Sequence, residues 1–591
     1  LFSFFMLVLA YQAMKQKIVI SKRTNCIIGL GLLLSVVYLY FHQYSFISKT
    51  QPQAISRFLS KFSILSVLGI AAVTCFIFYA YWEKSQKSQL EKMIRMALAA
   101  VILVLAAVLL KTGYLLSQVG ITAMLYLSIL FILNFKISRL SMIVVSVLTI
   151  FEFGYNAYLS QVTFGYDDVH KFADATVSVK RVTDNIQENA DQKFYRIATD
   201  FAYSRTVPSL VSYPGLSTFS SSLERSTMDH FAFMGDLGVN AATQYSNGTP
   251  LTDALYGVRY FMSAKDFDPK EIEANPDKMY FYRFTDRFDL HRYFTDKVYE
   301  DKRYVVYKNP NSFPLAYGTN SLVRNIQFGA NNAFANQNII LNSMEGHQKA
   351  NNDTVEYFKP LAFSSIETEN VIEEKVNKET GEAIYKRADS SKDAIIRYKV
   401  TPRTNYTYYF FTPVSLIQNQ DYSVLLNNKW LLNAKIFTQR QIWQLTDQTE
   451  NQETVIEFRF RTDHIDMSNA GVYRADVDQI QQVLENRKKQ GLQVTKFSNT
   501  HIVGDVSITD DSNYMMTSIP YSDGWKVKVD GKFVKTEKAW NAFLSFPISK
   551  GNHKVEFVFR QKGVILGALL SIVSVAYLVI QMRRSRSNEG Q

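Results

Sequence analysis

The distribution of apolar residues constrains this chain of 591 residues more than any other feature. Long hydrophobic segments, called oily runs below, fill the sequence up to residue 158, and another lies at 564–582. Residues 159–562, in contrast, are rich in Tyr, Asn, Asp and Thr, as in an ordinary water-exposed domain. Because a chain of this length exceeds what one core can serve, the pattern predicts a helical membrane region and a separate large domain.

The oily runs are long enough to cross a bilayer as helices. The predicted spans are an opening run that reads as a truncated first span, and then 26–44, 62–82, 93–110, 114–135, 140–158 and 564–582. The opening run has neither the basic start nor the cleavage site of a signal peptide. We therefore expect residues 1–158 to hold six spans, the first truncated, and further sequence to precede them.

The net charge of +12 follows the membrane topology rather than a nucleic-acid-binding surface. If the loops alternate between the two sides of the membrane, 13 Lys and Arg residues fall on one side and only 4 on the other. The positive-inside rule makes the first side cytoplasmic, together with the basic tail at 583–591. Residues 159–562 then face the outside, and we exclude nucleic acid as a partner. Both cysteines, Cys26 and Cys75, lie in oily runs, so this domain contains no disulfide.

The first part of the outer domain, residues 159–317, shows mixed α+β signals. In "SSLERSTMDHFAFMG", Ser221 stands three residues before Glu224, which predicts a capping box, and Gly235 predicts the end of the helix. "VRYFMSA" and "RYVVYKNP" read as short strands that end at turn residues.

The second part predicts two similar β-sandwich modules, at 318–472 and 497–562. The dipeptide Asp530-Gly531 predicts a tight hairpin in the second module. Between the modules, "ADVDQIQQVLENRKKQG" predicts a helix within 473–496 that ends at Gly491. A span at 563–582 follows the second module. The repeat aligns Val424 with Val527, Lys429 with Lys532, and Phe458 with Phe557.

Several blocks of the outer domain closely resemble the YfhO family of bacterial polytopic membrane proteins, in the family's order. They are "KFYRIATD", "SYPGLSTFSSSL", "LYGVRYFMS", "VYKNPNSFPLAYG" and "IPYSDGWKVKVDGK", followed by a membrane span. The resemblance implies a GT-C-like, lipid-linked-sugar glycosyltransferase. In that fold a catalytic carboxylate sits on the first outer loop, for which this chain has no matching position, so we expect it to be the C-terminal portion of a longer protein. The fold class is then a multi-span α-helical membrane region, GT-C-like and N-terminally truncated, plus a large extracytoplasmic α+β domain with tandem β-sandwich modules.

Four residues of the membrane region are candidates for contacting a lipid carrier. Glu152 and Asn156 are four apart and share a helix face, where they either line a cavity or bind a neighbouring helix. Arg57 and Lys61 lie on a predicted outer loop and either reach headgroup phosphates or simply lead into the next span.

The outer domain offers further candidates near its start. The stretch "SYPGLSTFSSSLERSTMDHF" supplies aromatic and charged groups suited to a sugar or polyol phosphate, although a cap and a packed core explain them equally well. "GYDDVH" supplies possible ligands for a divalent cation, although a solvated turn is the simpler reading, and no other cofactor is indicated. Three aromatics of the modules form either a polymer platform or core. The candidates for binding a sugar or polyol phosphate are Tyr213, Phe219, Glu224, Arg225, Asp229 and His230. The possible cation ligands are Asp167, Asp168 and His170, and the aromatics of the modules are Trp430, Tyr521 and Trp525.

From the resemblance we expect a membrane glycosyltransferase that moves a sugar from undecaprenyl phosphate to an envelope polymer such as lipoteichoic acid on the outer face. The expected partners are the bilayer, the lipid-linked sugar and the polymer acceptor. Two alternatives stay open at this point: a permease or lipid transporter, and a non-catalytic glycopolymer-binding partner of a separate transferase.

Overall fold

The computed structural model describes residues 139–163 and 169–589, apart from short internal gaps. The gaps are 246, 266–281, 284–286, 295, 330–331, 349–350, 378–380, 403–405, 413–420, 433–441, 447–452 and 510–511. The chain divides into two compact units, Leu1–Asp167 and Asp168–Gln591.

The first unit is described only at its end, where α6 (Arg139–Thr163) forms a helix of 25 residues that covers the predicted span at 140–158. The predicted spans before residue 139 lie outside the described residues. Among the described residues, one helix meets the length and hydropathy expected of a membrane span. This stretch, Val564–Met582, lies within α16 (Val564–Glu589) and coincides with the last predicted span.

The second unit begins with a sheet that is covered by a helix on each face. α7 (Val169–Glu188) packs on one face through Val179 and Val182, and α10 (Pro250–Leu255) packs on the other through Leu251. β6 is the predicted strand "VRYFMSA", confirmed over its whole length. The strand order is β1 (Arg196–Thr199), β6 (Val258–Ala264), β9 (Tyr304–Lys308) and β8 (Asp296–Glu300).

The predicted capping box before the next helix is wrong. α9 (Arg225–Phe233) begins after Glu224, whose side chain makes no capping hydrogen bond, so Ser221 is not the N-cap. Ser221 lies in the preceding turn, where Ser220 and Ser222 bond to each other. The predicted end is confirmed, since Gly235 follows α9 with φ of 95°. Other short elements of this region are β2 (Phe201–Ala202), α8 (Val207–Val211), β3 (Thr218–Phe219), β4 (Leu237–Val239), β5 (Ala242–Gln244), β7 (Tyr282–Arg283) and α12 (Leu290–Tyr293).

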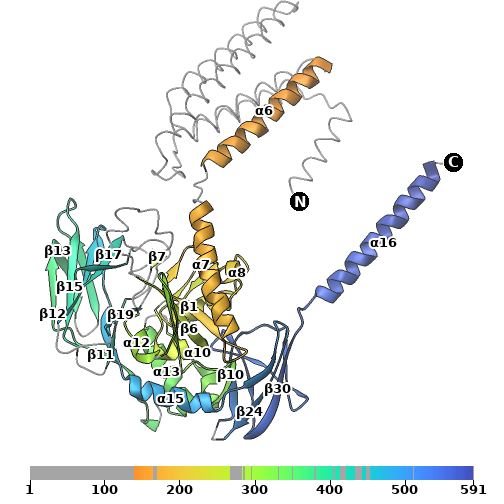
Figure 1. Cartoon of the computed structure of the whole chain (residues 1–591). Coiled ribbons are helices and arrows are strands. Elements are labelled where there is room, and N and C mark those ends of the chain that lie inside the picture. The colour runs from red at the N-terminus through yellow and green to blue at the C-terminus, as the bar shows by residue number, and fades with distance from the viewer. Residues whose placement is uncertain are drawn as a thin grey trace, which may run out of the picture. The chain divides into compact units, whose positions relative to one another are not determined.

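Two further pairs of sheets follow, each pair packed around its own apolar core. In Figure 1 they occupy opposite sides of the domain, with β12 and β15 at one side and β24 and β30 at the other. Both pairs join a four-stranded sheet to a five-stranded sheet.

The first pair consists of the sheets β11-β22-β16-β19 and β12-β15-β20-β17-β18, with a three-stranded extension β13-β14-β21. The strands are β11 (Phe358–Leu361), β12 (Ser365–Glu369), β13 (Val371–Asn377), β14 (Glu382–Arg387), β15 (Ala394–Val400), β16 (Thr407–Phe411), β17 (Tyr422–Leu426), β18 (Lys429–Leu432), β19 (Ile442–Thr446), β20 (Thr454–Phe460), β21 (His464–Asp466) and β22 (Gly471–Ala475).

The second pair consists of the sheets β10-β25-β29-β28 and β23-β24-β30-β26-β27. The strands are β10 (Ala316–Thr319), β23 (Gln493–Phe497), β24 (His501–Ile508), β25 (Tyr514–Pro520), β26 (Trp525–Val529), β27 (Lys532–Val534), β28 (Glu537–Ala539), β29 (Phe543–Pro547) and β30 (Gly551–Phe559). β10 comes from far earlier in the chain than the other strands of this pair, and it lies across the predicted boundary at 317. The domain boundaries stay predictions.

Residues that the sequence repeat aligns have equivalent partners in the neighbouring strands. Val424 of β17 pairs with Phe458 of β20, and Val527 of β26 pairs with Phe557 of β30. The hairpins repeat as well: Leu426 pairs with Lys429 in the first, and Val529 pairs with Lys532 in the second. The residues aligned in the sequence therefore occupy equivalent places in the two five-stranded sheets.

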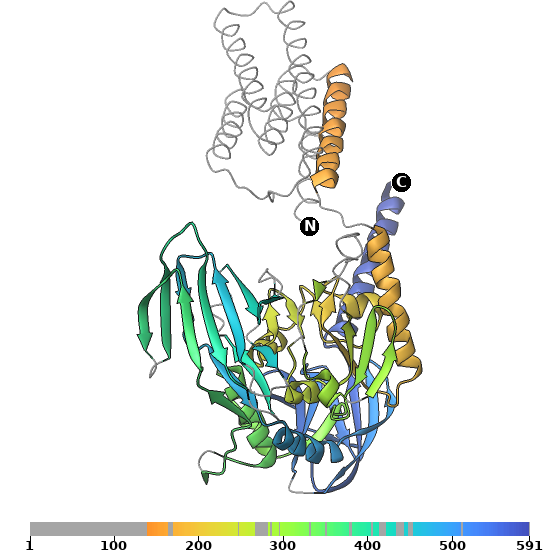
Figure 2. The same ribbon diagram turned by 60° about the vertical axis from the view of Figure 1, so that its left-hand side comes forward.

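One central core joins the α+β region to both pairs of sheets. α15 (Val477–Lys489) contributes Val477, Ile480 and Leu484, as its apolar face predicts. α13 (Ala333–Glu345), which follows η2 (Ser321–Asn325), contributes Phe334 and Ile340. Figure 2 shows α13 and α15 together at one end of the domain, between the two groups of strands.

Candidate functional site

The six residues of the second unit that are predicted to bind substrate fall into separate environments rather than one pocket. Tyr213 and His230 are both buried. Tyr213 belongs to the core beneath α7, whereas His230 packs against Phe543 in another part of the domain. Phe219 and Arg225 are exposed, and Asp229 is partly exposed. Glu224 lies at the surface just before α9. Whether the exposed residues contact a sugar stays a prediction.

His230 is enclosed by aromatic rings. It stacks on Trp540 at 5.9 Å between ring centroids and meets Phe543 edge-on at 4.7 Å. Only 1% of the residue is exposed, and neither ring nitrogen has a hydrogen-bonding partner among the described residues. Burial disfavours the charged imidazolium and lowers the pKa of His230 to about 3. The ring is therefore neutral and belongs to the core.

Tyr213 also faces inward, with 8% of the residue exposed, in the core beneath α7. Burial raises the pKa of its hydroxyl above the usual range. Its aromatic face packs against protein and is not presented to a ligand from solvent.

The exposed residues of the stretch make two separate contacts, one within α9 and one at the preceding strand β3. Arg225 and Asp229 approach to 3.6 Å on successive turns, with 89% of the Arg225 side chain exposed. Nearby in sequence, the Arg205 guanidinium lies over the Phe219 ring at 5.5 Å from its centroid. An exposed aromatic ring and two guanidinium groups suit an anionic or hydroxyl-rich ligand.

The candidates of the membrane region are described only in part. Glu152 is a partly buried residue of α6, and Asn156 follows it by four positions on the same helix. Arg57 and Lys61 lie outside the described residues.

The possible cation ligands at the start of the second unit are described only in part. His170 is exposed in the first turn of α7, while Asp167 and Asp168 lie outside the described residues. Within the described ranges no group of three His, Cys, Asp or Glu residues is arranged to hold a metal. A divalent cation stays a prediction.

Tyr521 and Trp525 pack partly buried against the core of the second pair of sheets. The Trp525 ring lies 5.1 Å from that of Phe559. Trp430 belongs to β18, the edge strand of the corresponding sheet in the first pair.

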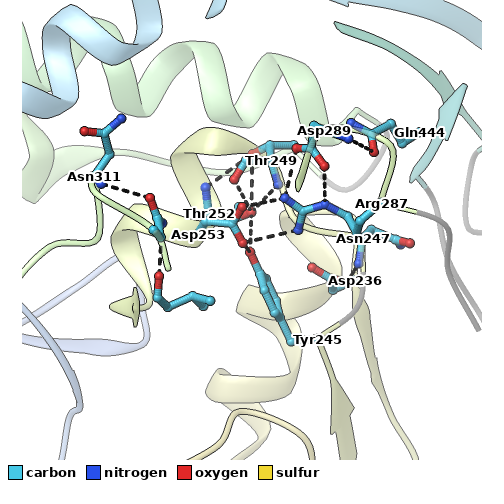
Figure 3. A network of polar contacts seen from close by, with 12 residues as sticks. Asp236, Tyr245, Asn247, Thr249, Thr252, Asp253, Arg287, Asp289, Asn311 and Gln444 are labelled. Carbon is cyan, nitrogen blue, oxygen red and sulfur yellow. Dashed lines mark hydrogen bonds and ion pairs between the residues drawn. The ribbon is translucent and has the colours of Figure 1, made fainter. Parts of the chain in front are cut away.

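Sequence reasoning missed a buried ionic network centred on Arg287, shown in Figure 3. The Arg287 side chain is fully buried and donates to Asp253 at 2.7 Å and to Asp289 at 2.7 Å. The Tyr245 hydroxyl donates to the same Asp253 carboxylate at 2.6 Å. Residues from α10, from the position just after β5 and from the segment before α12 thus meet around one guanidinium. Its members lie up to 44 positions apart and form no local motif, so no sequence signal marked them.

In this network one guanidinium lies between two carboxylates, and each charge shifts the pKa of its neighbours. Burial raises the pKa of Asp253, and the neighbouring Arg287 opposes that rise. The two carboxylates hold the pKa of Arg287 well above its usual value despite its burial. Because both carboxylate side chains are only 1% exposed, the network is closed to any substrate and fixes the packing of the elements that meet there.

Comparison with known proteins identifies the chain's relatives. A protein from Bacillus subtilis (strain 168), "Uncharacterized protein YfhO", is 26% identical over 121 residues, which are 20% of this chain and 14% of that protein. The family model "Bacterial membrane protein YfhO" matches residues 70–571 and so spans α6, the whole folded domain of residues 169–562 and the start of α16. The chain therefore belongs to the YfhO family of bacterial membrane proteins.

Proposed function

We propose that the full-length protein is a membrane glycosyltransferase that moves a sugar from an undecaprenyl-phosphate carrier to a cell-envelope polymer such as lipoteichoic acid. One observation supports this most: in a bacterial membrane protein, a large folded domain follows the apolar helix α6 in the sequence and precedes the apolar helix α16. A permease has no need of such a domain. A transferase must bring a long polymer to a carrier that stays in the bilayer.

The proposed reaction is a single displacement at the anomeric carbon. The acceptor hydroxyl attacks, a carboxylate takes its proton, and the carrier phosphate leaves towards donor groups that stabilise its charge. The Arg287 network is closed to solvent, so it does not carry this chemistry. We place the reaction among the membrane spans, with the outer domain presenting the acceptor.

Sidedness is the first part of the proposal to test. The end of α16 carries Arg583, Arg584 and Arg586, which supports a cytoplasmic tail and an outer domain outside the membrane. Protease added to intact protoplasts is expected to cut within residues 169–562, while a cytosolic marker protein stays whole. Protection of this region until the cells are lysed contradicts the proposed location.

The enzymatic activity requires an assay with defined substrates. Purified full-length protein, mixed with a synthetic lipid-linked sugar and an acceptor polymer, is expected to release the carrier phosphate and label the polymer. A binding partner without catalytic activity would retain the polymer but release no phosphate. If the protein is instead a transporter, deletion of its gene would leave envelope glycosylation unchanged. Polymer binding without phosphate release, or unchanged glycosylation after deletion, would overturn the proposal.

The exposed surface at α9 is the part of the outer domain that we assign to the acceptor. The variant Phe219→Ala/Arg225→Ala is expected to raise the KM for the polymer several-fold and to leave the unfolding temperature within about 1 °C, since both side chains are exposed. Lys180→Ala is the matched control, because Lys180 and Asp184 form a similar exposed pair one helical turn apart on α7. An equal change in both variants argues against a specific role.

A further inference from the structure

The membrane helix α16 follows directly on the second pair of sheets. β30 ends at Phe559 and α16 begins at Val564, so only residues 560–563 lie between them. The apolar stretch of 19 residues spans about 28 Å as a helix, close to the ~30 Å hydrocarbon core of a bilayer. Val564 therefore marks the level at which the chain enters the hydrocarbon.

The loop before β26 is tied to this entry point by three contacts. Trp525 pairs with Phe559 at the end of β30, and the Arg560 amide donates to the Gly524 carbonyl at 2.9 Å. The Lys562 ammonium donates to the Asp523 carboxylate at 2.7 Å. This partner lowers the pKa of Asp523, which keeps the ion pair charged.

These contacts limit how far the loop can stand from the bilayer. Lys562 is two residues before Val564, and two residues of extended chain reach at most ~7 Å. The polar layer on each face of a bilayer is itself roughly 5–8 Å thick. The side chain that holds Asp523 thus starts within the headgroup layer or at its edge.

The composition of this end of the sheet suits that layer. Tyr521 and Trp525 are the residue types that gather where headgroups meet hydrocarbon. Lys526 and Arg560 are exposed beside them, and Lys562 adds a third cation against the single acidic Asp523. Phospholipid phosphates complement this positive charge.

We propose that residues 521–526 and 560–562 dock on the phospholipid headgroups, with Tyr521 and Trp525 in the interfacial layer and Lys526 and Arg560 at the phosphates. This contact sets the orientation of the second pair of sheets: the end of β30 that carries Phe559 faces the membrane and the end that begins at Gly551 faces away. The inference depends on α16 as a membrane anchor and not on the proposed glycosyl transfer.

The test uses the full chain with Cys26 and Cys75 changed to Ser, reconstituted in vesicles of phosphatidylcholine and phosphatidylglycerol. A fluorophore is attached at Ser522→Cys, in the loop, or at Lys550→Cys, an exposed position at the far end of β30. The two ends of β30 are about 26 Å apart. A lipid with a nitroxide on its headgroup is expected to quench the label at position 522 and to leave the label at position 550 unquenched. Absence of quenching at 522, or equal quenching at both positions, overturns the proposal.

A second pair of variants tests the charges without disturbing the core. Lys526→Gln is expected to lower the ratio of docked to undocked loop about fivefold in anionic vesicles, as judged by quenching at position 522. Lys532→Gln changes an equally exposed lysine of the adjacent strand, at the hairpin end, and is expected to have no effect. Equal quenching in both variants contradicts contact between Lys526 and phosphate.

Discussion

His230 makes the stability of the folded domain of residues 169–562 depend on pH. Its pKa is about 3 in the folded protein, below the ordinary value of about 6.5 that an unfolded chain shows. The unfolded state therefore binds more protons between these values, and the free energy of unfolding falls as the pH drops from about 6.5 towards 3. Denaturant unfolding of the full chain, followed at several pH values by far-UV circular dichroism, is expected to show this loss.

The variant His230→Phe separates this effect from that of other groups. Phenylalanine keeps the stacking on Trp540 and removes two buried nitrogens without partners among the described residues, so we expect a gain of roughly 1 kcal/mol at neutral pH. It should also weaken the loss of stability in acid. An unchanged pH dependence would show that His230 is not the group that titrates.

Removal of one member of the Arg287 network should be costly. Asp253→Leu removes one of the two carboxylates around the Arg287 guanidinium and takes this acceptor from the Tyr245 hydroxyl, so a loss of roughly 1–3 kcal/mol is expected. The double variant Asp253→Leu/Arg287→Met should lose less than the sum of the losses in Asp253→Leu and Arg287→Met, because part of each single loss comes from the partner that is left unpaired. Thermal unfolding of the four proteins measures this difference, and strict additivity contradicts the coupling.

At the level of residues, the sequence identified exposed candidates better than buried ones. Arg225 and Phe219 are at the surface as a binding role requires, whereas His230 and Tyr213 are in the core. A polar residue within an apolar pattern has the same local sequence whether it binds a ligand or packs inside. The Arg287 network could not be predicted because its charges meet only after distant segments fold together.

At the level of elements, two equivalent hairpins provide a direct test of turn geometry. Asn427 and Asn428 have φ of 48° and 67°, and Asp530 and Gly531 have φ of 51° and 79°, as type I′ turns require. Asn428→Gly should stabilise the protein by about 0.5–1 kcal/mol, because glycine adopts this conformation without strain. Gly531→Asn, the reverse change in the other hairpin, should destabilise it. Unfolding temperatures that move in the same direction for both variants would contradict this reading.

Elements with strong periodicity were predictable. α15 and β6 form where the apolar pattern places them, because one face of each is buried. The capping box at Ser221 was not, since serine side chains also stabilise turns, and here Ser220 bonds to Ser222. The alignment of the two repeats in the sequence matches the strand pairing in the structure, because equivalent strands bury the same alternate positions.

At the level of the whole molecule, the α+β region and both pairs of sheets share one core. Residues as distant as Ala198 and Phe543 belong to the same buried cluster. The Trp540 indole N–H also donates to the Val323 carbonyl at 3.0 Å across the domain. The sequence showed the repeated units but not this sharing, because contacts between units leave no periodic pattern.

The second module is therefore expected not to fold by itself. Residues 497–562 lack β10, which pairs with β25 along four residues, and lack nearly all of β23, the neighbour of β24. Without β10, an edge of β25 that is buried in the domain becomes exposed and invites aggregation. Expressed alone, this segment should be insoluble or give no cooperative transition in calorimetry, while residues 169–562 should be soluble and unfold in a single transition. A soluble, cooperatively unfolding 497–562 fragment would show that the module is independent, and would return the boundary to the position that the sequence repeat suggests.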